Sequence, residues 1–505
     1  MPNANLFAIL SSRYPSSPEA VFLESPDGKV VSYGEMDELS GRMAAALRAL
    51  GTRVGDRVVV QVEKTPQAVA LYLACLRVGA VYIPLNTAYT TAELDYFLSD
   101  SEPRILVCDP SAEEALRAIA LNHGVAHTMG LNSKGGGSWV DTVSGYSPDP
   151  IIEICTADDI AAILYTSGTT GRSKGAMLSH GNLASNALSL HRLWAFRDGD
   201  VLLHALPIYH VHGLFVALHC AMLNGSKVWF LPRFNIDTVV DLISETTVMM
   251  GVPTFYVRLL SDPRFDRNLC ARMRLFIAGS APLLVDTFDE FEARTGHRIL
   301  ERYGMTEAGM ITSNPYDGLR LAGSVGFPLP DVEARVCDDA GHGVAFGETG
   351  TLEISGPNVF KGYWRNPGKT AAEFRDDGFF VTGDLSVMDR DGRVTIVGRA
   401  KDLIISGGFN VYPKEVESEL DEIEGVRESA VIGIPHPDLG EGVTAVVVTE
   451  PGVTLTPEEV QHHLKERLAK FKQPKRVFFM AELPRNAMGK VQKKTLRDCY
   501  SAIYD

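Results

Sequence analysis

The stretch from Asp56 to Asn86 changes its hydrophobic pattern twice. It begins with the apolar run Arg-Val-Val-Val-Gln-Val, continues with a helix-like segment that ends at Gly79, and returns to the apolar run Val-Tyr-Ile-Pro-Leu. A strand, a helix and a second strand joined in this way form a βαβ unit, whose two strands lie parallel in one sheet. The sequence therefore predicts an α/β fold.

Similar apolar runs recur between residues 160 and 280, and each leads into a turn that contains glycine, serine or proline. These runs cover residues 160–167, 200–207, 226–232, 247–253 and 273–280. In parallel sheets, ligand-binding residues collect in the turns that follow the carboxyl ends of the strands. We therefore expect the functional residues in these turns.

The length of 505 residues predicts more than one domain, because a single core seldom serves so long a chain. Residues 1–400 are predicted to form a large domain of layered, mostly parallel sheets, with a small β-rich subdomain at about 320–400. Residues 401–505 are predicted to form a small α+β domain. This domain is expected to contain one helix that starts at about Pro413 and another over Glu458–Phe471.

Composition and charge exclude several classes of protein. The net charge of −15 disfavours broad attraction to nucleic acid or to an anionic membrane, since both require a basic surface. The seven cysteines are odd in number and include no Cys-x-x-Cys pair, which argues against a disulfide framework and against a zinc site. No stretch approaches the ~18 to 20 apolar residues of a transmembrane helix, and the first residues lack the basic flank of a signal peptide. We expect a cytoplasmic protein.

Residues 165–175, Tyr-Thr-Ser-Gly-Thr-Thr-Gly-Arg-Ser-Lys-Gly, directly follow an apolar run. Glycines let the backbone approach a phosphate, hydroxyls and N–H groups supply donors, and a lysine neutralises charge. The spacing differs from a Walker A loop. A lone Gly-Thr-Thr-Gly would suit an ordinary polar loop, but the longer pattern favours a phosphate site. The candidate phosphate-binding residues are Thr166, Ser167, Gly168, Thr169, Thr170, Gly171 and Lys174.

Further motifs follow in order along the chain: Tyr303-Gly-Met-Thr-Glu307, Thr382-Gly-Asp384, Gly398-Arg399 with Lys401-Asp402, Gly407-Gly408-Phe409-Asn410, and Pro484-Arg-Asn-Ala-Met-Gly-Lys490. Together with residues 165–175, they resemble the adenylate-forming superfamily of acyl-CoA synthetases, luciferases and peptide-synthetase adenylation domains. The resemblance covers essentially the whole chain. It implies an enzyme that uses ATP and Mg²⁺ to convert a carboxylic acid into an acyl-adenylate, and then passes the acyl group to coenzyme A.

The resemblance also implies roles for individual residues. Glu307 would ligate Mg²⁺, Thr306 would touch the α-phosphate, and Lys490 and His210 would complete the catalytic set. Besides the phosphate loop, the residues that would bind ATP or AMP are Gly279, Ser280, Ala281, Tyr303, Gly304, Thr306, Asp384 and Arg399. These roles suit the chemistry, because the attack of a carboxylate on a phosphate brings anions together and requires cations and oriented donors.

The small domain is expected to be mobile, again by resemblance. It would turn about a hinge at Lys401, withdraw Lys490 and bring Gly407 and Gly408 to the pantetheine of coenzyme A. A hinge requires only a few residues that absorb the dihedral change. Taken alone, Lys490 in its turn-rich stretch would be an ordinary exposed lysine, and the two glycines would be an ordinary turn.

The acid substrate is expected to be set by Arg302, in the position before Tyr303 where many relatives have a small residue. A buried arginine is costly unless it is paired, and its planar fork suits a second carboxylate on the substrate. This residue, together with Pro-Ile-Tyr-His-Val-His-Gly-Leu at 207–214, resembles malonyl-CoA and methylmalonyl-CoA synthetases. His210, Val211 and Met305 are the other candidate substrate residues, and Val211 is expected to help the site tolerate methylmalonate.

Alternatives to this assignment stay open in the sequence. The same chemistry could serve another short-chain mono- or dicarboxylate, with Arg302 turned into a salt bridge within the protein. A nucleotide-binding regulatory protein without turnover is disfavoured by Lys490, Glu307 and the phosphate loop. Arg233 is a second candidate cation for the acid, although a loop arginine is ordinarily exposed. The preference between malonate and methylmalonate and the oligomeric state are not indicated by the sequence.

Overall fold

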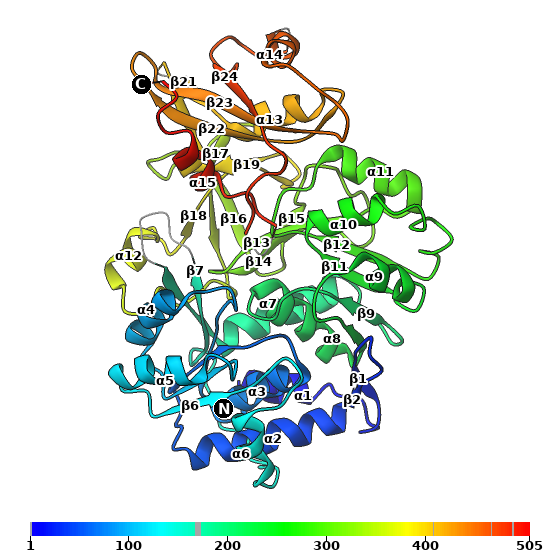
Figure 1. The fold of residues 1–505 in the computed structure, drawn as a ribbon, viewed down its shortest axis with the longest axis vertical. Coiled ribbons are helices and arrows are strands. Elements are labelled where there is room, and N and C mark those ends of the chain that lie inside the picture. The colour runs from blue at the N-terminus through cyan, green and yellow to red at the C-terminus, as the bar shows by residue number, and fades with distance from the viewer. Residues whose placement is uncertain (1–2, 167–172, 408, 466, 487–488, 505) are drawn as a thin grey trace. The chain divides into compact units, whose positions relative to one another are not determined.

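The computed structural model describes residues 3–166, 173–407, 409–465, 467–486 and 489–504. The chain divides into two compact units, and each is described by itself (Figure 1). The first unit consists of residues 1–333 and 354–380, and the second of residues 334–353 and 381–505.

A six-stranded sheet in the first unit contains the predicted βαβ element. Its strand order is β6-β5-β3-β4-β7-β8. The strands are β3 (Arg57–Gln61), β4 (Val81–Pro84), β5 (Ile105–Cys108), β6 (His127–Gly130), β7 (Ile160–Thr166) and β8 (Lys174–Ser179). Helix α3 (Pro66–Arg77) joins β3 to β4, which pair in parallel as expected, and it begins where the side chain of Thr65 accepts from the backbone N–H of Ala68. Among the described strand pairs of this sheet, only β7–β8 at the edge is antiparallel.

A nine-stranded sheet of the same unit has the order β15-β14-β13-β12-β11-β9-β10-β1-β2. Its strands are β1 (Val21–Glu24), β2 (Val30–Ser32), β9 (Val201–His204), β10 (Lys227–Phe230), β11 (Val248–Gly251), β12 (Leu275–Ala278), β13 (Leu300–Met305), β14 (Gly309–Ser313) and β15 (Phe327–Pro328). The strands from β1 to β13 along this order pair in parallel. The turns after β9, β12 and β13 therefore open at the same edge of the sheet.

Helices bury the faces of both sheets. Helices α9 (Ile236–Ile243), α10 (Pro253–Leu260) and α11 (Val285–Thr295) lie beside β11 and β12 in Figure 1, where Val239, Tyr256 and Phe291 pack on Phe276 of the sheet. Helices α4 (Thr91–Ser101) and α5 (Glu113–Asn122) share a core with β3, β4, β5 and β7. The other helices of the first unit are α1 (Leu6–Ser11), α2 (Tyr33–Ala49), α6 (Ser138–Ser144), α7 (His180–Leu193), the π-helix η1 (His212–Leu218), α8 (His219–Asn224) and α12 (Pro367–Ala372).

The second unit is built on two smaller sheets. One has four strands in the order β16 (Glu333–Cys337), β17 (Thr349–Ser355), β18 (Phe380–Met388) and β19 (Val394–Arg399). The other contains β20 (Ile404–Ser406), β21 (Phe409–Val411), β22 (Val426–His436), β23 (Gly440–Thr449) and β24 (Arg476–Phe479). Helices α13 (Pro413–Asp421) and α14 (Pro457–Lys465) pack on one face of this sheet and α15 (Lys493–Cys499) on the other, and a 3₁₀ turn, η2 (Ala400–Asp402), follows β19.

The predicted fold class is confirmed, since a large part rich in parallel strands precedes a separate α+β part. The predicted length of one helix was wrong. It was expected over Glu458–Phe471, but α14 ends at Lys465, and the amide N–H of Lys472 donates to the carbonyl of Ala469 in a turn. None of the helices within the described ranges is long and apolar enough to cross a membrane.

Candidate functional site

The segment after β9, the turn after β12 and strand β13 meet at the carboxyl edge of the nine-stranded sheet in the first unit. The hydroxyl of Ser280, after β12, lies 3.3 Å from Nδ1 of His212. A Cβ on Gly279 would lie 2.5 Å from Cζ of Arg302, so the guanidinium passes directly over that glycine. Ser280 also has a positive φ of 71°, which is uncommon for a residue with a side chain and marks a turn held in a strained shape. The predicted residues Gly279, Ser280 and Arg302 are therefore neighbours.

Arg302 is a buried cation with unused hydrogen-bonding capacity. It lies on β13 with 2% of its surface exposed, and its Nε and Nη2 atoms have no partner in the described chain. Burial lowers its pKa to about 9, and the nearby Tyr256 and Glu301 oppose that shift. Arg302 forms no ion pair with a described carboxylate, so the alternative of an internal salt bridge finds no support. A charge left in this state costs several kcal/mol, which marks the position as a site for an anion.

The segment before η1 carries the other candidate substrate residues. His210 is half-buried, and its Nδ1 accepts from the backbone N–H of His212 at 3.3 Å. His212 is buried, and its pKa is held well below the ordinary value, first by burial and then by the Arg302 cation. The ring of His212 is thus neutral near pH 7. Met305, at the end of β13, is half-buried.

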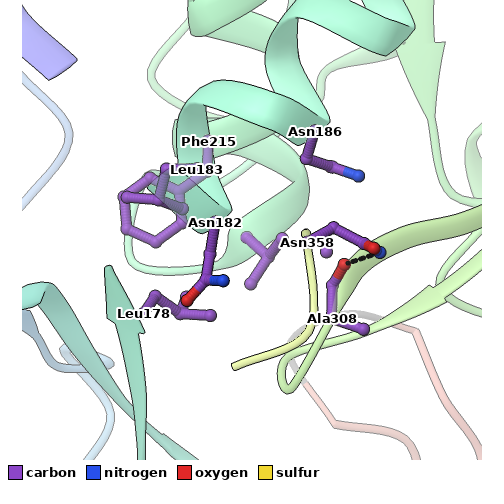
Figure 2. Close-up of a pocket in the computed structure, with 9 residues that line it drawn as sticks. Leu178, Asn182, Leu183, Asn186, Phe215, Ala308 and Asn358 are labelled. Carbon is purple, nitrogen blue, oxygen red and sulfur yellow. Dashed lines mark hydrogen bonds between the residues drawn. The ribbon is translucent and has the colours of Figure 1, made fainter. Parts of the chain in front are cut away.

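Val211 is buried and lines a small pocket of the first unit. Figure 2 shows this pocket, in which the amide of Asn358 donates to the carbonyl of Ala308 at 2.8 Å. Its lining residues are Leu178, Asn182, Leu183, Asn186, Val211, Phe215, Ala308, Gly309 and Asn358. The pocket volume of about 10 Å³ leaves room for about one water and none for an acid. Val211 therefore borders tightly packed protein on this side.

Glu307 lies in the tight turn between β13 and β14, with 7% of its surface exposed. The strand before it needs glycine at Gly304, because a Cβ there would lie 2.8 Å from Cα of Met310. The hydroxyl of Tyr363 lies 3.0 Å from Oε1 of Glu307 and 2.6 Å from Oε2 of Glu373. Thr306 precedes Glu307 in the same turn, as the motif implies.

The phosphate loop is flanked by β7 and β8. Thr166 ends β7 and Lys174 begins β8, and the two are register partners in this antiparallel pair. Nζ of Lys174 lies 3.5 Å from Oε1 of Glu373 and 4.7 Å from the ring centroid of Tyr363. Ser167, Gly168, Thr169, Thr170 and Gly171 lie outside the described residues. Tyr363 and Glu373, which were not among the predicted residues, thus connect the expected phosphate lysine with the expected Mg²⁺ carboxylate.

A single carboxylate at Glu307 fits Mg²⁺, which commonly uses one or two carboxylates together with substrate phosphates and water. Within the described part of the chain, no group of three or more His, Cys, Asp or Glu side chains could hold a metal ion. The hydroxyl of Tyr363 lies within hydrogen-bond distance of this carboxylate, and partners of this kind usually orient metal ligands.

In the second unit, Asp384 and Arg399 face each other across the β18–β19 hairpin. Nε of Arg399 lies 2.6 Å from Oδ1 of Asp384, and the carboxylate is buried. Lys401 follows in η2, and its pKa is lowered first by burial and then by Arg399. These groups provide one carboxylate and two cations on the β18–β19 hairpin and the turn that follows it.

Lys490 lies close to the same groups. Partial burial, followed by the Arg399 cation, lowers its pKa to about 8. The residue as a whole is solvent-exposed, so water screens part of this effect. Gly407 follows β20 with a φ of 59°, a conformation that favours glycine, and Gly408 lies outside the described residues. Arg233 is exposed in the loop between β10 and α9, as expected for an ordinary loop arginine.

The chain matches the family of AMP-binding enzymes over residues 10–364 and the AMP-binding enzyme C-terminal domain over residues 415–490. The protein therefore belongs to the AMP-binding enzyme family. It is similar to the solved structure of ATP-bound MatB from Rhodopseudomonas palustris, with 56% identity, a TM-score of 0.98 and 100% of each chain covered.

Two curated relatives resemble the chain to a similar degree. The malonate–CoA ligase of Arabidopsis thaliana is 34% identical over 518 residues, which cover 93% of this chain and 85% of the relative. The feruloyl-CoA synthase of an Amycolatopsis species is 35% identical over 474 residues, which cover 93% and 94%.

Proposed function

We propose that this protein is an AMP-forming malonyl-CoA synthetase. Malonate and ATP give malonyl-adenylate and pyrophosphate, and coenzyme A then displaces AMP to give malonyl-CoA. The malonate–CoA ligase named among the relatives supports this assignment. The feruloyl-CoA synthase is 35% identical to the chain, so the residues of the site decide which acid binds.

The observation that carries the choice of acid is the buried, unpaired guanidinium of Arg302. A monocarboxylate would present only a hydrocarbon tail to this cation and would leave it without a partner. A second carboxylate supplies an acceptor for two parallel hydrogen bonds. Since the protein has a net charge of −15, a local cation is also needed to hold a dianion.

In the first half-reaction, a carboxylate oxygen of malonate forms a bond to the α-phosphorus, and the bond from that phosphorus to the bridging oxygen of pyrophosphate breaks. Lys174, the phosphate loop and Thr306 bind the phosphates. Lys490 supplies a cation to the developing charge. Mg²⁺, held through Glu307, neutralises phosphate charge when it is bound. Asp384 accepts hydrogen bonds from the ribose hydroxyls, and Arg399 fixes its carboxylate.

In the second half-reaction, the sulfur of coenzyme A forms a bond to the acyl carbon, and the bond from that carbon to the AMP oxygen breaks. The thiol proton leaves as the thioester forms. We place the boundary between a large domain, residues 1–400, and a small mobile domain, residues 401–505, at the hinge residue Lys401. Gly407 and Gly408 would then lie along the pantetheine arm.

Two further features are part of the proposal. Methylmalonate is proposed as a second substrate, because the methyl groups of Val211 would tolerate a branched acid that a polar side chain would reject. A cytoplasmic location is proposed because all seven cysteines are free, six of them buried, as suits a reducing compartment.

The test is pyrophosphate release with a panel of acids, with and without coenzyme A. Malonate should give the highest kcat/KM, followed by methylmalonate, with acetate, propionate, longer fatty acids and ferulate far below. Acyl-CoA should form only in the presence of coenzyme A. A preference for any monocarboxylate would overturn the malonate assignment and leave the enzyme class intact.

A further inference from the structure

Lys64 is a buried lysine without a carboxylate partner among the described residues. It follows β3 and has 9% of its surface exposed. Its Nζ lies 2.6 Å from Nδ1 of His204, 2.9 Å from the carbonyl oxygen of His204 and 4.4 Å from the ring centroid of Phe230. A lysine is seldom buried unless it is paired with an anion, so these contacts require an explanation.

The contacts of His204 define the tautomer of its ring. Its Nε2 lies 2.9 Å from the carbonyl oxygen of Gly213, which can only accept. Nε2 must therefore carry the proton, and the neutral ring offers Nδ1 as an acceptor. Burial, followed by the charge of Lys64, holds the pKa of His204 well below its ordinary value, which keeps the ring neutral. Lys64 donates to Nδ1 and so favours this tautomer.

His204 and Gly213 are the two ends of one loop. The segment leaves β9 at His204 and returns at Gly213 in the first turn of η1. Gly213 packs so tightly that a Cβ there would lie 2.9 Å from the carbonyl carbon of Pro207. Between these ends lie His210, Val211 and His212, and Nδ1 of His212 in turn contacts Ser280. The His204–Gly213 hydrogen bond thus closes the base of the loop that carries the candidate substrate residues.

We propose that Lys64 is a positioning residue, which fixes the His204 tautomer and thereby the shape of the substrate-binding loop at residues 204–213. This inference rests on the proposed function, because it assigns that loop to the acid. Without the donor at Nδ1, only the Gly213 carbonyl favours the proton on Nε2. The ring can then carry its proton on Nδ1 instead, and a lone pair of Nε2 would face that carbonyl. The two acceptors repel each other, and the loop opens at its base.

The contact also joins the two sheets. Lys64 belongs to the segment after β3 of the six-stranded sheet, and His204 ends β9 of the nine-stranded sheet. The loop is therefore held from outside its own sheet, by a residue 140 positions away in the chain.

The variants Lys64→Met and Lys64→Gln test this role. Methionine keeps the length and apolar stem but removes the donor, whereas the glutamine amide can still donate to Nδ1. We expect Lys64→Met to lower kcat/KM for the acid by about 10- to 100-fold, because displacement of about 1 Å can cost that much. KM for ATP should stay within about twofold, since uniform loss of structure would move both values. Lys64→Gln should recover part of the loss.

Lys227→Met is the matched control. Lys227 also lies over an aromatic ring, with its Nζ 4.1 Å from the centroid of Trp229, and it pairs with Glu24 without touching the loop. Its kinetics should match those of the wild type. In protein with ¹⁵N-labelled histidine, the resonance assigned to His204 by a His204→Gln variant should show the Nε2–H tautomer. The ¹⁵N resonances of His204 should indicate a changed tautomer in Lys64→Met and the wild-type tautomer in Lys227→Met.

An unchanged His204 tautomer in Lys64→Met, or equal losses in Lys64→Met and Lys64→Gln, would overturn the proposal. If Lys64→Met does not fold, the His204 tautomer and the kinetics of Lys64→Gln are the test. In the variant tested, a KM for ATP that rises as much as the KM for the acid would contradict the proposed role. Each assay uses the acid that the wild-type enzyme prefers. If the wild-type enzyme rejects malonate, the proposed substrate is refuted. The role of Lys64 in positioning the loop is then still tested with the acid that the enzyme does use.

Discussion

The guanidinium of Arg302 lies against the backbone of Gly279, at a place where any Cβ would come within 2.5 Å of Cζ. The two residues belong to β13 and to the turn after the neighbouring parallel strand β12. Glycine at this turn therefore has two effects. It lets the backbone approach the expected nucleotide, and it leaves space for the guanidinium of Arg302, which a Cβ would displace.

Gly279→Ala should consequently displace Arg302. Overpacking of this kind costs about 1 to 3 kcal/mol. We expect kcat/KM for malonate to fall by about 10- to 100-fold, at ~1.4 kcal/mol per tenfold. Because Gly279 is also predicted to bind the nucleotide, KM for ATP is measured together with kcat/KM for malonate. A larger effect on ATP than on malonate would contradict the role of this glycine in placing Arg302.

Tyr363→Phe should weaken the binding of Mg²⁺. The hydroxyl lies between the carboxylates of Glu307 and Glu373, so its loss frees the expected metal ligand to rotate. Loss of such a supporting group costs about 10- to 100-fold in metal affinity. A Mg²⁺ titration of pyrophosphate release at saturating ATP should show at least a tenfold higher midpoint, while the thermal midpoint of unfolding without Mg²⁺ changes little.

Tyr33→Phe provides the control for this substitution. Its hydroxyl is also buried and hydrogen-bonded, to the carbonyl of Ser226 at 2.9 Å, but it lies away from the metal ligand. Its Mg²⁺ midpoint should equal that of the wild type. Equal shifts in both variants would show that the effect of Tyr363 is only structural.

Lys490 should set the alkaline limit of adenylation. With its pKa lowered to about 8, the ammonium is present below this pH and is lost as the pH rises through it. The kcat/KM for acid-dependent pyrophosphate release, which reports groups of the free enzyme, should therefore fall above about pH 8. Lys490→Arg should abolish the decrease of kcat/KM above about pH 8, since the guanidinium stays charged. Lys490→Ala should lower adenylation by about 10²- to 10³-fold and leave thioester formation from supplied acyl-adenylate intact.

The hinge prediction concerns Lys401, which lies in the turn between β19 and β20. Proline fixes φ and removes the N–H, so Lys401→Pro should block the dihedral change and leave the side chains of the site in place. We expect near-normal adenylation and at least a tenfold slower thioesterification. Lys401→Ala keeps a free backbone and should be close to the wild type in both steps. A wild-type overall rate in the proline variant would place the pivot elsewhere.

The sequence predicted the strands and turns of the sheet because their signals are local. The predicted apolar runs at residues 200–207 and 273–280 contain β9 and β12, which end at His204 and Ala278 near the turns where the expected residues lie. Such features need only a pattern of adjacent residues. The arginine at position 302, by contrast, was recognised through the resemblance of the motif that it precedes.

Other parts of the site depend on contacts between distant segments. Tyr363 reaches Glu307 across 56 positions, and Lys64 reaches His204 across 140. Neither Tyr363 nor Lys64 stands in a pattern that marks it, since a tyrosine after glycine and a lysine before a helix are ordinary. Thr65 and Pro66 are typical of a helix start, and they give no sign that the lysine before them is buried.

The assignment of malonate depends most directly on Arg302. If its guanidinium pairs the distal carboxylate, Arg302→Ala leaves a dianion in a pocket without a partner, at a cost of roughly 3 to 5 kcal/mol. This corresponds to a loss of about 10²- to 10³-fold or more in kcat/KM for malonate.

Arg302→Lys should recover only part of the loss, because an ammonium cannot form two parallel hydrogen bonds to one carboxylate. Propionate, which has no distal carboxylate, should lose much less and can even gain, since removal of an unpaired buried cation relieves its desolvation. The informative measurement is therefore the ratio of kcat/KM for malonate to that for propionate, under saturating ATP and coenzyme A. Arg233, exposed in its loop, provides the matched control, and Arg233→Ala should leave the ratio unchanged. A ratio that stays at its wild-type value in Arg302→Ala would separate this arginine from the acid and refute the reason for assigning malonate.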